Sequence, residues 1–374
     1  MKKVVHFIKK EAVLCASGVL AIVSCFIVPP SAKYLEYIDL RVLALLFCLM
    51  AVVAGIRAAG AFDVICEALL KRLRSIKAVG LALVLLSFFM SMLLTNDVAL
   101  VTLVPFTLLL FESINGEKKA RAEIILLVLE TAAANLGSML TPMGNPQNLY
   151  LYSKFNLMFS EFLTIIFPYS LLSLVLLIAS VFLFLPKLRI EKTEKNGSAA
   201  LHGRMKAVLF LILFAVCMLS ILRILDYRIL LGIIVIAVLI LDRRLFLKVD
   251  YSLLLTFVFF FIFVGNLGSI PALSESLRGV LQGREVWLGI ALSQVISNVP
   301  AAILLSGLSE NAPSLIIGTN LGGLGTLIAS MASLITYKFY AASNGSSPKK
   351  YMLIFTAFNL AYLALLCGLY AIIH

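Results

Sequence analysis

The stretch LLTNDVA, residues 93–99, decides the fold because it places Thr95, Asn96 and Asp97 in the middle of an apolar run. The run extends from about 78 to 111 and carries no other charge, and basic segments flank it at 71–77 and 116–123. Two arms of about 16 residues would each cover about 24 Å, whereas a bilayer core is about 30 Å thick. We therefore expect a re-entrant helical hairpin that enters from the cytoplasm and turns at Thr95–Asp97.

The composition indicates a membrane protein. Of 374 residues, 62% are hydrophobic and 13% charged, against about 45–50% and 25% in soluble domains. The apolar segments lack the alternation of β-barrel strands, and helices satisfy their own backbone groups in lipid. The expected fold class is an all-α polytopic membrane protein.

The net charge of +12 is concentrated in short loops between apolar segments. This is the positive-inside pattern, so we expect membrane lipid around the chain and no nucleic-acid partner. The apolar segment 12–28 is long for a signal peptide and lacks a clear cleavage site. The sequence predicts a multi-pass protein of the cell membrane with a cytoplasmic N-terminus and an outside C-terminus.

Cysteine and histidine positions argue against an enzyme or a metal site. The six cysteines are scattered through apolar segments without a C-x-x-C spacing, and the three histidines lie near the termini or in a polar loop. The motifs G-x-S-x-G and H-E-x-x-H are absent from the sequence. We expect no cofactor and no metal beyond transported sodium.

The chain divides into two halves. The first, 1–186, contains the hairpin at about 78–111 and a helix at about 124–152 that TPMGNPQN (141–148) interrupts. A basic linker at 187–206, expected in the cytoplasm, leads to the second half, 207–374. That half contains a hairpin at about 286–308 around SNVP (297–300), and a broken helix at about 315–338.

The two halves share motifs in the same order. SMLLTND (91–97) matches SQVISNV (293–299), and NLGSMLTP (135–142) matches NLGGLGTL (320–327). Loop charges place the halves in opposite orientations, which predicts an inverted repeat with two re-entrant hairpins and two broken transmembrane helices. Such repeats are typical of secondary transporters, whose site lies near the membrane midplane.

These motifs, extended to LLTNDVALVTLVPF, ANLGSMLTPMGNPQNLYLY, SQVISNVPAAILLSG and GTNLGGLGTLIASMASLITYK, resemble the ion transporter superfamily. That superfamily includes divalent-anion:sodium symporters, citrate transporters, arsenite permeases and D-type sodium/proton antiporters. The resemblance covers about Arg41 to the end of the chain. It implies a homodimer in which a transport domain with both hairpins moves against a scaffold domain.

The resemblance also implies site residues. For cation binding it implies Ser91, Thr95, Asn96, Gly144, Ser293, Ser297 and Asn298, and we add Asp97, the ionisable residue at the first tip. For substrate binding we expect Asn96, Asn135, Thr141, Asn145, Asn148, Asn298, Asn320, Thr326 and Ser330. Asp97 at the first tip and Val299-Pro300 at the second depart from the tips of dicarboxylate symporters, which weakens the case for a dicarboxylate substrate.

Several residues allow a second interpretation. Asp97 is either a cation ligand or proton carrier, as its place in a membrane favours, or a helix cap. Glu130 is either a proton relay candidate or a structural residue that forms an ion pair with Arg57 or contacts a cytoplasmic cavity. Asn135 and Asn320 either line the site or bond across helices. A last group of glycines either allows close packing or unwinds the backbone: Gly137, Gly322, Gly323 and Gly325.

The sequence thus favours a secondary active transporter of a small anion, an inorganic oxyanion or a carboxylate, coupled to sodium or protons by alternating access. The alternative is a cation/proton antiporter that uses Asp97 and Glu130. An intramembrane enzyme would need a nucleophile–base pair or a metal cluster, and the sequence shows no motif for either. A non-transporting scaffold or receptor has no need of mirrored polar tips. No nucleotide-binding motif is present, and the sequence leaves open whether an ATPase partner acts on the chain.

Overall fold

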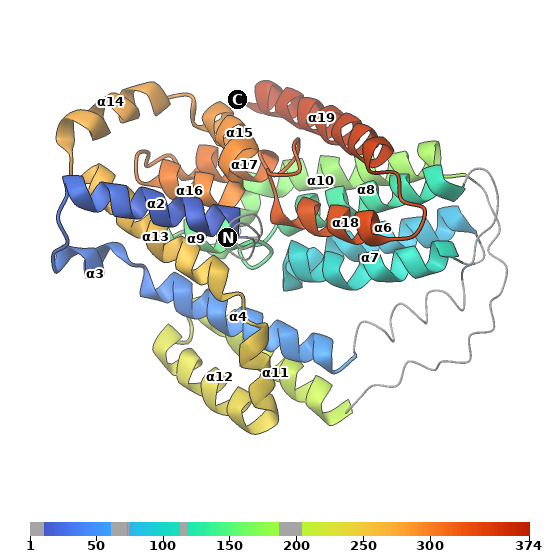
Figure 1. Cartoon of the computed structure of the whole chain (residues 1–374), viewed down its shortest axis with the longest axis horizontal. Coiled ribbons are helices and arrows are strands. Elements are labelled where there is room, and N and C mark those ends of the chain that lie inside the picture. The colour runs from blue at the N-terminus through green and yellow to red at the C-terminus, as the bar shows by residue number, and fades with distance from the viewer. Residues whose placement is uncertain (1–10, 61–72, 74, 113–118, 187–203) are drawn as a thin grey trace, which may run out of the picture.

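The computed structural model describes residues 11–60, 73, 75–112, 119–186 and 204–374, and its regular elements are helices. Five of the described helices are long and apolar enough to cross a membrane, namely α4 (Leu40–Ala58), α6 (Ile76–Leu94), α10 (Phe159–Phe184), α13 (Tyr251–Gly268) and α19 (Pro348–Ile373). Large apolar side chains such as Phe167, Val175, Leu255 and Leu353 point outward on the long helices, as lipid-facing residues do. The described part of the chain is helical throughout its regular elements and has the build of a polytopic membrane protein (Figure 1).

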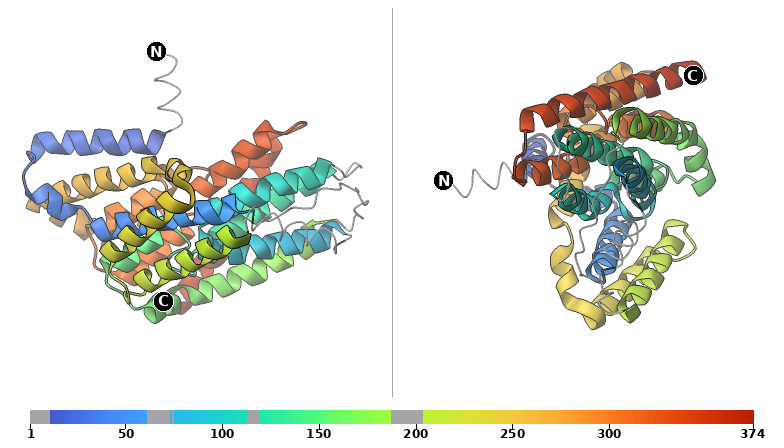
Figure 2. Two further views of the ribbon diagram at one scale, coloured as in Figure 1. Left: turned by 90° about the horizontal axis from the view of Figure 1, so that it is seen from below. Right: turned by 90° about the vertical axis from the view of Figure 1, so that its right-hand side faces the viewer.

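The helices pack as two groups, each built from both halves of the chain. The first, here called the scaffold group, contains helices that pack around α4 and α13. Its members are α2 (Ala12–Ile27), α3 (Lys33–Tyr37), α4 (Leu40–Ala58), α11 (Arg204–Ile221), α12 (Tyr227–Asp242), the 3₁₀ helix η1 (Arg243–Lys248) and α13 (Tyr251–Gly268). In the end-on view of Figure 2, α11 and α12 lie beside α4 and away from most of the other helices.

The second, the hairpin group, packs around α8 and α17. Its members are α6 (Ile76–Leu94), α7 (Asn96–Glu112), α8 (Lys119–Ser138), α9 (Pro146–Lys154), α10 (Phe159–Phe184), α15 (Glu285–Ile296), α16 (Asn298–Ser306), α17 (Ala312–Leu321), α18 (Met331–Ala342) and α19 (Pro348–Ile373). Helix α14 (Pro271–Leu281) connects the groups, and α4 contacts α9 while α13 contacts α16.

Short polar residues fix where the scaffold and hairpin helices begin. Asp39 accepts a hydrogen bond from Val42 N at the start of α4, and Asp250 accepts one from Leu253 N at the start of α13. Ser75 accepts one from Ala78 N at the start of α6. Each side chain satisfies an N–H that has no partner within the helix.

Helix α4 ends at Ala58, before Gly60 with φ +73°. Helix α6 has 19 residues, against about 16 expected for this arm, and is long enough to cross a membrane. Most of the predicted linker, 187–203, lies outside the described residues.

A single residue separates the two arms of each expected hairpin. Thr95 separates α6 from α7, and Ser297 separates α15 from α16. The arms of the second pair have 12 and 9 residues, or about 18 and 14 Å at 1.5 Å per residue. Each is shorter than a bilayer core of about 30 Å. In Figure 1 the first pair extends to one end of the molecule and the second pair lies toward the other.

Glycine lets each broken helix approach the first arm of its hairpin. A Cβ at Gly137 would collide with the backbone oxygen of Phe88 and with the Ser91 hydroxyl. A Cβ at Gly322 would collide with Ser293 and the backbone oxygen of Gly289. These two glycines therefore serve close packing, which resolves one of the alternatives raised by the sequence.

Substituting Gly137→Ala or Gly322→Ala should therefore lower the melting temperature of the purified protein in detergent. Overpacking against backbone atoms typically costs about 1–3 kcal/mol. Gly232→Ala is the matched control because a Cβ there, within α12, meets nothing within 4 Å. A melting temperature unchanged in both variants would show that the helices do not need this close approach.

Candidate functional site

The two turn residues share an unusual backbone conformation. Thr95 has φ 91° and ψ 147°, and Ser297 has φ 74° and ψ 155°. This region is close to one that is nearly confined to glycine, and a non-glycine residue there costs of order 1–3 kcal/mol. Strain of this kind persists where the surrounding structure enforces it, and it gathers at binding sites.

Matching backbone hydrogen bonds attach each turn to the broken helix of its own half. Asn96 N donates to Gly144 O over 3.2 Å, and Asn298 N donates to Ala329 O over 3.0 Å. Gly144 and Ala329 each follow the asparagine of an N-L-G motif by nine residues. The correspondence that the motifs predict therefore extends to contacts between elements.

A second pair of contacts follows the same correspondence. The Thr141 hydroxyl donates to Met92 O, and the Thr326 hydroxyl donates to Gln294 O. Met92 and Gln294 each directly follow the matched serine of a hairpin arm. Both threonines were expected in the substrate site; here each joins an unwound segment to a hairpin.

Two amide side chains satisfy the backbone where the broken helices unwind. Asn148 Nδ2 donates to the carbonyl oxygens of Ser138, Met139 and Thr141. Gln294 Nε2 donates to those of Gly322 and Leu324, and Gln294 Oε1 accepts from Thr326 N. Gln294 was not among the predicted site residues, although an amide beside Ser293 in an apolar arm was the available signal. Gly325, with φ +110° and packed on Gln294, belongs to the unwound backbone.

Asn135 joins the first tip to the second broken helix. Its Oδ1 accepts from Asn96 Nδ2 at 3.0 Å and from the Ser330 hydroxyl at 2.9 Å, and its Nδ2 donates to Ser333 at 3.4 Å. Ser330 directly follows Ala329, which binds the second tip. Hydrogen bonds from Asn96 through Asn135 to Ser330, and from the adjacent Ala329 to Asn298, therefore connect the two tips.

Asn320 makes the corresponding connection between the halves. Its Nδ2 donates to Asn148 Oδ1 at 2.7 Å, and Asn145 Nδ2 donates to the Ser138 hydroxyl at 2.6 Å. The Oδ1 atoms of Asn145 and Asn320 are buried and have no hydrogen-bond partner among the described residues. Asn135 and Asn320 therefore both bond across helices. Because Asn135 also bonds the first tip, a helix-joining role does not exclude a place in the site.

Asp97 lies in the first turn of α7, but the cap hydrogen bond comes from its neighbour. Asn96 Oδ1 accepts from Asp97 N at 2.9 Å. The Asp97 Oδ1 atom is buried without a hydrogen-bond partner in the described part of the chain. Helix N-termini favour negative charge, so the start of α7 stabilises the Asp97 carboxylate electrostatically. The carboxylate does not cap the helix by a hydrogen bond.

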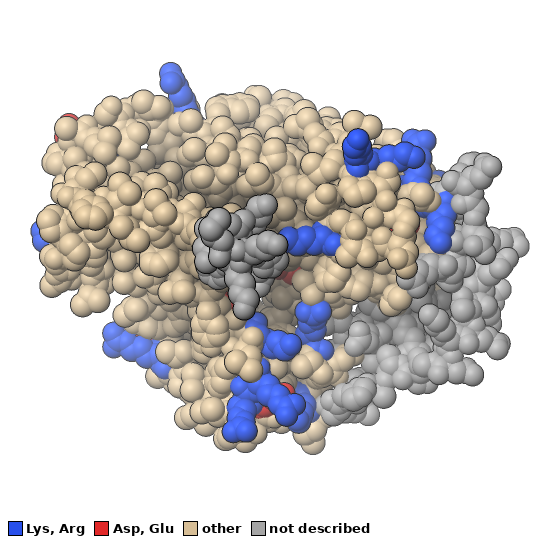
Figure 3. Space-filling model, in the orientation of Figure 1, with Lys and Arg blue, Asp and Glu red and all other residues tan. Residues whose placement is uncertain are grey.

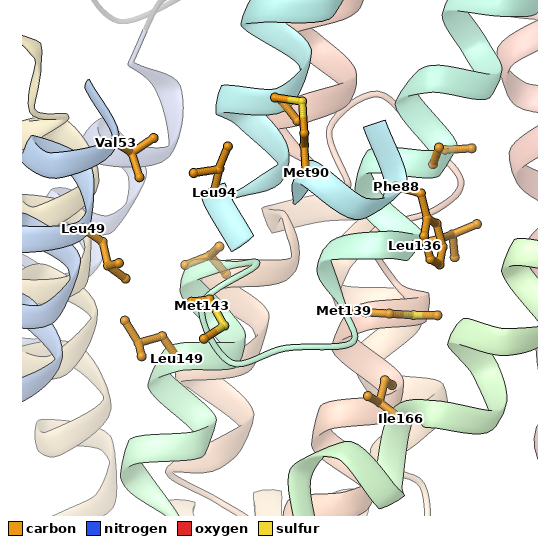
Figure 4. Close-up of a cluster of buried hydrophobic side chains, with 14 of the residues drawn as sticks. Leu49, Val53, Phe88, Met90, Leu94, Leu136, Met139, Met143, Leu149 and Ile166 are labelled. Atoms are coloured by element: carbon orange, nitrogen blue, oxygen red, sulfur yellow. The ribbon is translucent and has the colours of Figure 1, made fainter. Parts of the chain in front are cut away.

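A cavity of about 600 Å³ lies between the scaffold group and the hairpin group. Leu49 and Val53 of α4 face Leu94, Met143 and Leu149 across this region (Figure 4). Its mostly apolar walls also come from α7, η1, α13 and α18, and its polar lining residues are Arg57, Thr95, Asp97, Asn145, Lys248 and Asp250. Lys and Arg side chains border the hollow on this face of the molecule (Figure 3).

Pro105 creates a contact between the groups at this cavity. Proline has no N–H to bond the carbonyl four residues earlier, which is that of Val101. Arg57 Nη2 donates to this oxygen at 3.4 Å. The contact places the α4 guanidinium on the backbone of α7, one turn from Asp97.

Glu130 lies in α8, is fully buried and does not line this cavity. Thr107 donates to its Oε1 at 2.6 Å, and its Oε2 has no hydrogen-bond partner among the described residues. Thr107, and not Arg57, is thus its partner in the described structure. Transfer of an isolated carboxylate to an apolar interior costs far more than the roughly 1–3 kcal/mol of an unpaired hydroxyl.

The remaining predicted residues are placed as follows. Ser91 and Ser293 are buried, and each hydroxyl donates to a carbonyl of its own helix, Phe88 O or Gly289 O. The Ser297 hydroxyl is near Asn298 Oδ1 at 3.5 Å and Ala329 O at 3.4 Å. The structure therefore gathers the predicted residues around the two tips and the unwound segments, and it places Thr95, Asp97 and Asn145 on the cavity.

The hydroxyls of α18 were also missed. Ser333 and Thr336 follow Ser330 at intervals of three residues and are fully buried, and Thr336 accepts from Thr131 at 2.9 Å. Their regular spacing after the broken helix was the available signal. Among the described cysteines, Cys15, Cys25, Cys48, Cys217 and Cys367 are free thiols; Cys66 lies outside the described residues.

Proteins of three other organisms are similar to this chain in sequence. An uncharacterized transporter of Methanocaldococcus jannaschii is 35% identical over 303 residues, which cover 80% of this chain and 80% of the relative. The inner membrane protein YbiR of Escherichia coli is 33% identical over 324 residues, covering 84% and 83%. The silicon efflux transporter LSI3 of Oryza sativa subsp. japonica is 35% identical over 131 residues, covering 35% of this chain and 26% of LSI3.

The model of the citrate transporter family matches residues 4–315. This match spans the scaffold group, the first hairpin, both tips and the start of the second broken helix. The family is one of membrane transporters and not of enzymes, in keeping with the sequence prediction. The chain belongs to the citrate transporter family, CitMHS.

Proposed function

We propose that the protein is a secondary active transporter that moves a small anion, an inorganic oxyanion or a carboxylate, coupled to sodium or protons by alternating access. The observation that carries this proposal is the cavity between the two helix groups. It extends from Arg57, Lys248 and Asp250 to Thr95 at the first tip. Movement of one group against the other would expose the tips to either side.

The mirrored contacts support the inverted repeat. Strained turns at Thr95 and Ser297 and matching bonds to Gly144 and Ala329 recur in both halves. Arms of 12 and 9 residues support a re-entrant second hairpin. We infer that the hairpins enter from opposite sides, that the N-terminus is cytoplasmic and the C-terminus outside, and that the conformation described here opens to the cytoplasm.

Cation binding belongs at the first tip. Asp97 Oδ1 is buried without a partner, and Thr95 and Asn145 line the same cavity. Carboxylate, amide and hydroxyl oxygens are suitable ligands for a hard cation such as sodium. A bound sodium ion or proton would offset the charge of Asp97 and so favour an anion beside it.

The anion belongs in the same cavity, between its basic end and the first tip. Arg57 and Lys248 line the basic end, and both attract anions toward the tips. The relative named as a silicon efflux transporter supports a small inorganic solute. The resemblance to dimeric transporters leads us to expect a homodimer, with lipid around it.

The second candidate function is cation/proton exchange without an anion. It is favoured by two acidic side chains with unpartnered oxygens, Asp97 and Glu130. Reconstitution into proteoliposomes distinguishes the candidates. Uptake of radiolabelled phosphate, arsenate or citrate driven by an imposed sodium or proton gradient supports the first. Gradient-driven sodium/proton exchange that needs no anion supports the second, and the absence of both fluxes contradicts transport by this route.

Asp97→Asn should uncouple transport from the driving cation, because it removes the unpartnered carboxylate while keeping the side-chain size. At the same external anion concentration, the anion flux of the variant should no longer depend on the sodium or proton gradient. Asp250→Asn is the matched control: it lines the same cavity, and asparagine can still cap α13. Coupling that survives in Asp97→Asn would leave Asp97 without a role in cation binding.

Asn96→Ala and Asn298→Ala should each abolish flux while the protein remains folded. Asn96→Ala removes the bond to Asn135, and a hydrogen bond between membrane helices contributes about 0.6–2 kcal/mol. Near-normal melting temperatures with loss of uptake are the expected result. Asn359→Ala, a buried amide of α19 that bonds its own helix, is the control and should transport. Normal uptake in both tip variants would argue against the tips as the site.

A cysteine at Val101, on the cavity wall, should react with a membrane-impermeant maleimide from the cytoplasmic side. The experiment uses a variant without the native cysteines and compares inside-out vesicles with intact cells. Val104→Cys, on the same helix but fully buried, should stay unlabelled. Faster labelling of Val101→Cys in intact cells would reverse the proposed orientation.

A further inference from the structure

Glu130 forms a buried acidic site away from the cavity. Its side chain is fully buried, and residues 124–138 around it on α8 are buried as well. The Thr107 hydroxyl of α7 donates to Oε1 at 2.6 Å, whereas Oε2 has no hydrogen-bond partner among the described residues. An acidic side chain inside a membrane protein usually pairs with a base or has a function.

The charged groups on the elements that pack against α8 do not neutralise Glu130. Tyr351, buried at the start of α19, is a titratable group on which a charge at Glu130 would act. The Asp, Glu, Lys and Arg side chains that the structure describes on these elements are engaged elsewhere or exposed: Lys77 of α6 donates to Phe182 O, Glu161 of α10 accepts from Met158 N, Asp97 of α7 lines the cavity, and Lys338 of α18 and Lys349 and Lys350 of α19 are exposed. None of these is a cationic partner for the carboxyl.

An unpaired carboxylate in such a site is far less stable than the neutral acid. We propose that Glu130 is a proton-binding site, that it is protonated in this conformation, and that it is separate from the cation site at Asp97. The step is simple protonation: one carboxylate and one proton give the acid, with the proton on the unpartnered Oε2. Release returns the proton to water, and no electron transfer is involved.

Exchange of this proton requires α7 to separate from α8. Thr107 lies two residues after Pro105, where α7 lacks one backbone hydrogen bond. Proline positions are common points of helix bending. We place the bend there, so that movement of this part of α7 would break the Thr107–Glu130 bond and admit water. The link of this movement to transport rests on the proposed function, whereas the protonated state does not.

The test is infrared difference spectroscopy of the full-length protein in lipid. At neutral pH the carbonyl stretch of a protonated carboxylic acid should be present and should lose a component in Glu130→Gln. Glu161→Gln is the control, because this exposed carboxylate caps α10 and is not proposed to hold a proton. A band unchanged in Glu130→Gln would overturn the proposal.

Thr107→Val gives an independent measurement that does not alter Glu130. Loss of the donated hydrogen bond should shift the Glu130 carbonyl band to higher frequency, because a free carbonyl has a stiffer C=O bond. Glutamine resembles the neutral acid in shape, so Glu130→Gln should keep a near-normal melting temperature. If the Glu130→Gln variant fails to fold, the frequency shift in Thr107→Val still tests the proposal. A carbonyl band that does not move in Thr107→Val contradicts protonation of Glu130.

Flux measurements then separate this site from the proposed function. In proteoliposomes that transport, flux through the Glu130→Gln variant should no longer depend on pH. Where sodium is the driving ion, an inward sodium gradient should still drive flux in this variant, because sodium binds at Asp97. Flux with unchanged pH dependence would overturn the coupling role of Glu130. A chain that moves no tested anion or cation would contradict the proposed function and leave the infrared result as it stands.

Discussion

The structure depends on one constraint: backbone groups exposed by an unwound helix inside a membrane must find partners within the protein. Two side-chain amides provide several of them here. Asn148 bonds the unwound carbonyls of the first broken helix, and Gln294 bonds those of the second. Because the amides occupy those carbonyls, the oxygens that remain unpartnered, such as Asp97 Oδ1 and Asn145 Oδ1, are the ones available to a solute.

The hydrogen bonds also connect the two tips to each other. Asn135 bonds both the first tip and the loop that holds the second, so neither tip can move far without the other. The scaffold group touches this unit mainly through α4 with α9 and α13 with α16. A rigid centre and a thin boundary, with the cavity lying on that boundary, are what a moving transport domain requires.

Much of this architecture could be predicted from the sequence. The helix breaks at Thr95 and Ser297, the unwound segments and the matched contacts of the two halves followed from polar interruptions in apolar runs and from two repeated motifs. The assignment of helices to two groups could not, because each group draws on both halves and its helices have apolar faces of similar composition. Gln294, Ser333 and Thr336 were missed because their role depends on which neighbouring carbonyl or hydroxyl faces them, and Glu130 could not be paired correctly until α7 was placed against α8.

The unequal arms have an electrical consequence. The first pair has 19 and 17 residues and the second 12 and 9, so in the proposed orientation the joined tips lie nearer the outer surface. The water-accessible path from the cytoplasm is then long and the remaining barrier thin. Since voltage falls mainly across the part of the membrane that water does not enter, an ion leaving the tips outward would cross most of the membrane potential within the length of the short arms.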